Sequence, residues 1–67
     1  MKVQVNDMEY SFNETELTIT DLLAKMNMST TGVVAEMDGE VFNNREFNSR
    51  KIKDGARIEL IRIVGGG

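Results

Sequence analysis

The sequence predicts an α+β fold in which a mixed five-stranded sheet packs on one helix, in the order β-β-α-β-β-β. Three patterns support this prediction. Residues 2–12 hold two short segments of alternating apolar and polar residues, residues 19–26 carry apolar residues at helical spacing, and residues 33–63 hold three further alternating segments. Alternation is the period of a half-buried strand, whereas the i, i+3, i+4, i+7 spacing is typical of an amphipathic helix. The 67 residues suffice for one domain with a small core.

The first two strands are expected to form a hairpin. Val3 and Val5 are separated by a polar residue and share one face of a strand, and residues 10–12 alternate again. Asn6-Asp7 lies between the two segments, and both residue types tolerate tight turn conformations.

The predicted helix begins after Thr18. The Thr18 hydroxyl can accept a hydrogen bond from the amide of Asp21, and the Asp21 carboxylate favours the positive end of the helix. This is a capping box with Asp in place of Glu. We expect the helix to stop at Asn27. Its apolar stripe faces the core and consists of Ile19, Leu22, Leu23 and Met26.

The remaining strands follow the helix. Residues 33–37 and residues 40–42 flank Asp38-Gly39, a hairpin turn in which both central residues take positive φ. Residues 43–49 are polar and irregular.

The irregular segment contains Phe47, which we expect to anchor it to the core. The last strand is apolar on both faces: Ile58 and Leu60 lie on one, Ile61 and Ile63 on the other. We expect the first and last strands to lie side by side in the centre of the sheet.

Composition excludes several classes of protein. The chain has no Cys and no His, which removes thiol nucleophiles, thiolate metal sites and the commonest general base. We therefore expect no catalytic residues and no metal site. A net charge of −3 argues against nucleic-acid binding, and no apolar run reaches membrane-spanning length, so we expect a cytoplasmic protein without membrane contact. Residues 1–40 carry two basic and eight acidic side chains, whereas residues 41–67 carry six basic and three acidic ones.

Five segments together resemble the ThiS family, the sulfur carriers of thiamine biosynthesis, which have a ubiquitin-like β-grasp fold. They are the opening strand ending at Asn6 and residues 18–23, 37–41, 53–59 and 64–67. The resemblance implies a β-grasp domain over residues 1–64 and a flexible glycine tail over residues 65–67.

The hairpin and the following loop depart from the family pattern. Family members often carry Asn-Gly where this chain has Asp38-Gly39. They often carry Pro-Arg and a Trp where Asn44-Arg45 and Phe47 stand here.

The chemistry implied by the resemblance resides in the tail. The Gly67 carboxylate is an anion at neutral pH and a poor electrophile, so it needs a better leaving group such as an adenylate. The chain has no Gly-rich loop with a Lys, so a partner must supply the ATP site. Glycine at 65, 66 and 67 has no Cβ and suits a narrow active site.

The resemblance also implies partners. An adenylyltransferase like the ubiquitin-activating enzymes would use ATP to activate Gly67. A sulfur donor such as a cysteine desulfurase would then convert it to a thiocarboxylate, which serves thiazole synthase. The chain itself would bind no cofactor and would not be an enzyme.

A surface for these partners is expected on the last strand. Ile61 and Ile63, with Val34 on the third strand, would form an exposed apolar patch, and Arg57 and Arg62 could lie at its rim.

Three alternative functions remain: a sulfur carrier for molybdopterin synthesis, a ubiquitin-like protein modifier, and a β-grasp binding module with an inert tail. The terminal glycines alone could also be a linker remnant.

Overall fold

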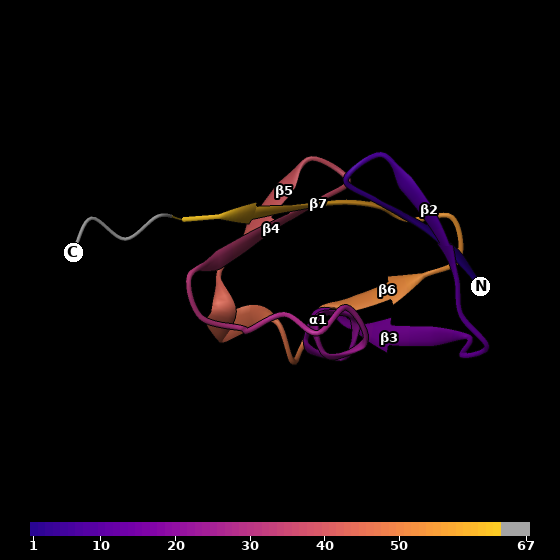
Figure 1. Ribbon diagram of the computed structural model, residues 1–67, viewed down its shortest axis with the longest axis horizontal. Coiled ribbons are helices and arrows are strands. Elements are labelled where there is room, and N and C mark those ends of the chain that lie inside the picture. The colour runs from indigo at the N-terminus through magenta and orange to yellow at the C-terminus, as the bar shows by residue number, and fades with distance from the viewer. Residues whose placement is uncertain (64–67) are drawn as a thin grey trace.

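The computed structural model describes residues 1–63, and they form a five-stranded sheet, a smaller two-stranded sheet and one α-helix (Figure 1). The large sheet has the strand order β2-β1-β7-β4-β5. The elements are β1 (Lys2–Val5), β2 (Met8–Ser11), β3 (Glu16–Thr18), α1 (Ile19–Lys25), β4 (Val33–Met37), β5 (Glu40–Phe42), the 3-10 helix η1 (Asn44–Glu46), β6 (Lys51–Lys53) and β7 (Arg57–Arg62). No helix in this part of the chain is long and apolar enough to span a membrane.

The large sheet is mixed, as the sequence predicts. The first and last strands, β1 and β7, pair in parallel, whereas β1–β2, β4–β5 and β4–β7 pair antiparallel. Both hairpins have two-residue turns with positive φ, at Asn6-Asp7 (49° and 68°) and at Asp38-Gly39 (53° and 89°). Such turns match the twist of the strands and therefore fix their register.

The helix α1 has the predicted cap at each end. The Thr18 hydroxyl accepts a hydrogen bond from the Asp21 amide at 3.1 Å, and the Asp21 carboxylate accepts one from the Thr18 amide at 3.0 Å. At the other end, Asn27 has φ of 58°, and the amide of Met28 donates to the carbonyl of Leu23 at 2.8 Å. This Schellman-type arrangement ends the helix where Asn27 predicts.

Two short strands were absent from the predicted order β-β-α-β-β-β. The strand β3 precedes α1, the strand β6 follows η1, and Leu17 pairs with Ile52 between them. Each strand is three residues long, too short for a recognisable alternation. Figure 1 shows β3, β6 and α1 together on one side of the molecule and the large sheet on the other side.

The core lies between the large sheet and α1. Phe47 is 1% exposed and joins it, which confirms that this side chain anchors the irregular segment. The other core residues are Val3, Val5, Ile19, Leu22, Leu23, Val33, Ala35, Phe42, Ile52, Ile58 and Leu60. Because α1 covers one face of the large sheet, side chains on the other face can contact a partner.

Candidate functional site

The outer face of the large sheet carries an exposed apolar patch over β4, β5 and β7. Ile61 and Ile63 are 44% and 55% exposed, and Val34, which is half-buried, pairs with Ile61 across β4 and β7. Ile58 and Leu60 point to the core, as the alternation along β7 requires. The three predicted apolar residues are thus brought together.

Val41, which sequence reasoning missed, extends this patch. It is 63% exposed and pairs with Glu36, so it is the diagonal neighbour of Val34 on the same face. Its face depends on the register of the β4–β5 hairpin. We call Val34, Val41, Ile61 and Ile63 the outer patch.

The two arginines predicted at the rim lie apart from each other. Arg57 begins β7 and pairs with Gln4, four residues before Ile61 on the same face. Arg62 pairs with Val33, a core residue, so its side chain leaves the opposite face of β7. Only Arg57 therefore shares a face with the outer patch.

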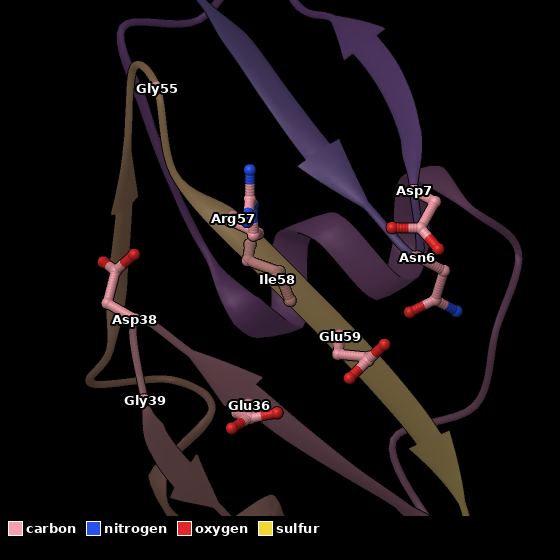
Figure 2. A pocket seen from close by; sticks show the side chains of 9 residues that line it. All are labelled: Asn6, Asp7, Glu36, Asp38, Gly39, Gly55, Arg57, Ile58 and Glu59. Carbon is pink, nitrogen blue, oxygen red and sulfur yellow. The ribbon is translucent and has the colours of Figure 1, made fainter.

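A groove of about 660 Å³ runs beside the outer patch, between the two hairpin turns and β7 (Figure 2). Figure 2 shows Glu36 and Glu59 on neighbouring strands, and the ladder pairs these two residues directly. Asp7 and Asp38 add two further carboxylates from the turns, and Arg57 is the single cation among the lining residues. Among residues 1–63, no group of acidic side chains is arranged to hold a metal ion. The groove therefore makes this part of the outer face acidic.

The strand β7 leads to the tail. The Ile63 amide donates to the carbonyl of Gly32 at 2.8 Å, one residue beyond the Val33–Arg62 pair. A second hollow of about 410 Å³ lies here, with Gly32, Arg62 and Ile63 among its lining residues. The predicted reactive residue Gly67, with Gly65 and Gly66, lies outside the described residues.

Two central strands paired in parallel and one helix across the sheet define a ubiquitin-like β-grasp protein. A model of the ThiS family matches residues 3–67, and the chain belongs to that family. The resemblance stated from the sequence is thereby confirmed.

Individual relatives match along almost the whole chain. The sulfur carrier protein ThiS of Bacillus subtilis is 28% identical over 65 residues, covering 97% of this chain and 98% of the relative. An uncharacterised protein of Porphyra purpurea is 28% identical over all of this chain and 93% of its own. The crystal structure of the thiamine biosynthesis protein ThiS from Geobacter metallireducens superposes with a TM-score of 0.85 at 29% identity, with 100% of both chains covered.

Proposed function

We propose that this chain is a sulfur carrier of thiamine biosynthesis and acts as a protein co-substrate rather than an enzyme. The observation that carries the proposal is the family match, which runs through the last strand and reaches Gly67. The sulfur carrier protein ThiS of Bacillus subtilis, to which the chain is similar over nearly its whole length, supports the same function. We further propose that the reaction takes place in the cytoplasm.

The proposed chemistry has two steps at Gly67. A carboxylate oxygen attacks the α-phosphorus of ATP on an adenylyltransferase, pyrophosphate leaves, and an acyl-adenylate forms. In the second step, a donor such as a cysteine desulfurase supplies sulfur as a persulfide, whose terminal sulfur displaces AMP to give an acyl disulfide. A second thiol of the partner then cleaves the S–S bond, which leaves a thiocarboxylate on Gly67 and a disulfide on the partner. The thiocarboxylate sulfur is a nucleophile that thiazole synthase can use. Gly65 and Gly66 keep the approach to Gly67 free of side chains.

The outer patch is the proposed docking surface for the adenylyltransferase. Ile61 lies near the end of β7 and Ile63 directly follows this strand, so a partner seated on them lies next to the start of the reactive segment. The adjacent groove carries four carboxylates and one guanidinium. Charge complementarity therefore favours a partner with an apolar centre and basic side chains opposite Glu36 and Glu59.

Intact-mass spectrometry tests the proposal. The chain is incubated with ATP, the adenylyltransferase and a sulfur donor, and its mass is compared with that of a variant lacking Gly67. We expect a gain equal to the exchange of one oxygen for sulfur, localised to Gly67 and absent from the shortened chain. An unmodified chain in the presence of an active partner would contradict the proposal and favour an inert binding module.

The same purified chain distinguishes the two sulfur-carrier functions from each other and from a ubiquitin-like protein modifier. Transfer of the sulfur to thiazole synthase in a reconstituted reaction supports the thiamine pathway, whereas transfer only to molybdopterin synthesis enzymes supports the alternative carrier. Isopeptide-linked adducts to lysines of other proteins would instead support the modifier.

A further inference from the structure

Gly32 is hydrogen-bonded to Ile63, the last described residue of the chain. Its carbonyl accepts the Ile63 amide at 2.8 Å, and a Cβ placed on Gly32 would lie 3.8 Å from the Ile63 carbonyl oxygen. This contact follows the Val33–Arg62 pair at the end of the β4–β7 ladder. Gly32 therefore lies at the end of the β4–β7 ladder, beside the last described residue before Gly67.

The backbone conformation of Gly32 makes this contact possible. Its φ is +73°, in the left-handed region that glycine adopts without strain and most other residues avoid. The next residue, Val33, is buried in the core, so the β4 side of Gly32 is fixed. On the other side, the Ser29 hydroxyl accepts the Thr31 amide at 3.1 Å and tightens the connection. The Gly32 carbonyl is thus held in place by its neighbours on both sides.

We propose that Gly32 is a positioning residue for the reaction at Gly67, because its left-handed conformation aims its carbonyl at the Ile63 amide and so fixes where the reactive segment begins. This inference rests on the proposed function and adds to it. Four residues follow Ile63, and four residues span at most about 14 Å even when fully extended. An active site reached from the outer patch must lie within that distance of Ile63.

Loss of the Gly32–Ile63 hydrogen bond would leave the backbone of Ile63 free to move before the partner binds. Every additional unfixed residue adds conformational entropy that binding must remove. The local concentration of the carboxylate at the partner's active site falls accordingly. Docking on the outer patch should be affected less, because Val34, Ile61 and Val41 remain paired in the sheet and Ile63 is the only member of the patch that is released.

The experiment compares Gly32→Asn, Gly32→Ala and Gly32→Val with the wild-type chain. Asn tolerates positive φ, Ala tolerates it less and a β-branched residue least, so the defect should increase in that order. Two quantities are measured: the dissociation constant for the adenylyltransferase without ATP, and the single-turnover rate of Gly67 adenylation at saturating enzyme. For Gly32→Val we expect the rate to fall roughly fivefold or more while the dissociation constant stays within about twofold.

Asn27→Ala is the matched control. Asn27 has φ of 58° in the same connection between α1 and β4, but its backbone amide donates to the Ala24 carbonyl at the end of the helix, whereas the Gly32 carbonyl accepts the Ile63 amide. This variant should lose stability through the same backbone strain and keep the wild-type adenylation rate. Amide hydrogen exchange gives an independent readout, since Ile63 should exchange at least about tenfold faster in Gly32→Val than in Asn27→Ala.

The outcomes separate the inference from the function on which it rests. A wild-type chain that is never adenylated overturns both. A wild-type chain that reacts, together with Gly32→Val reacting equally fast at saturation, overturns the role of Gly32 and leaves the carrier intact. A defect that follows side-chain size, with Gly32→Asn worse than Gly32→Ala, also overturns it, because the cause would then be crowding of the Ile63 carbonyl rather than backbone conformation.

Discussion

The side-chain amide of Asn6 pairs with both backbone groups of Leu60, 54 residues further along the chain. The Asn6 oxygen accepts the Leu60 amide at 2.7 Å, and its nitrogen donates to the Leu60 carbonyl at 3.3 Å. The backbone amide of Asn6 also donates to Ile58 at 3.0 Å. The side chain of Asn6 thus continues the parallel β1–β7 ladder past the point where β1 turns away, and ties the first hairpin to the strand that leads to the tail.

We expect Asn6→Gly to lower the free energy of unfolding by about 1–3 kcal/mol, since two hydrogen bonds are lost while positive φ is still tolerated. Asn27→Gly is the control, because Asn27 also has a positive φ, 58°, but its side chain makes no hydrogen bond with any of residues 1–63. Its change should stay within about 0.5 kcal/mol. Urea unfolding measures both. Equal losses would mean that the Asn6 amide contributes nothing beyond its turn conformation.

Phe47 gives the largest expected loss of stability. It is 1% exposed, and its backbone carbonyl accepts the Thr20 amide at 3.4 Å. Phe47→Ala leaves a cavity between α1 and the sheet, which should cost about 3–5 kcal/mol. A chain of 67 residues has about 3–10 kcal/mol in total, so thermal melting should show a largely unfolded variant. Phe47→Leu refills part of the cavity, and a melting temperature as low as that of Phe47→Ala would contradict the packing explanation.

The large sheet and the helix could be predicted from the sequence because their signals are local. Thr18 and Asp21 are three residues apart, Asp38 and Gly39 are adjacent, and β7 is long enough to show two apolar faces. The pairing of Leu17 with Ile52 and of Asn6 with Leu60 could not be predicted, because each joins residues from distant parts of the chain.

The outer face was only partly predictable for the same reason. Ile61 and Ile63 follow from the alternation along one strand, whereas Val41 and the acidic groove depend on the register between strands. Glu36 and Glu59 become neighbours only when β4 and β7 pair. The excess of acidic residues in the first forty positions was visible, but its gathering into one groove with Glu59 was not.

Glu36 and Glu59 are like charges directly opposite each other, an arrangement that destabilises antiparallel strands. We expect Glu59→Gln to raise the free energy of unfolding by about 0.2–1 kcal/mol, because the repulsion between the two carboxylates is removed. The same substitution should weaken binding to the adenylyltransferase, because basic side chains of the partner would no longer face the Glu59 carboxylate. Glu9→Gln removes the same charge opposite the neutral Gln4 and should change neither quantity. Stronger or unchanged binding by Glu59→Gln would argue against a basic partner.

The cap of α1 predicts a pH dependence. Hydrogen bonds from the Thr18 backbone amide, and with the Thr18 side chain, hold the pKa of the Asp21 carboxyl below its usual value of 3.8. A pKa lowered by folding stabilises the folded state above 3.8, and this contribution is lost as the pH falls through the folded pKa. Asp21→Asn should therefore flatten the decline in stability below about pH 4, measured by urea unfolding at a series of pH values. An unchanged slope would show that other carboxyls account for the decline.

Ile61 tests the docking surface most directly, because it lies at the centre of the outer patch opposite Val34. Ile61→Ala removes apolar area that a partner would cover, and truncation of such an anchor weakens an interface by about fivefold or more. Met8→Ala is the matched control: Met8 is 60% exposed against 44% for Ile61, but it lies on β2, two strands away from β7. Calorimetric titration with the adenylyltransferase should show weaker binding for Ile61→Ala alone. Equal affinities for the two variants, both checked as folded by circular dichroism, would move the docking surface away from the outer patch.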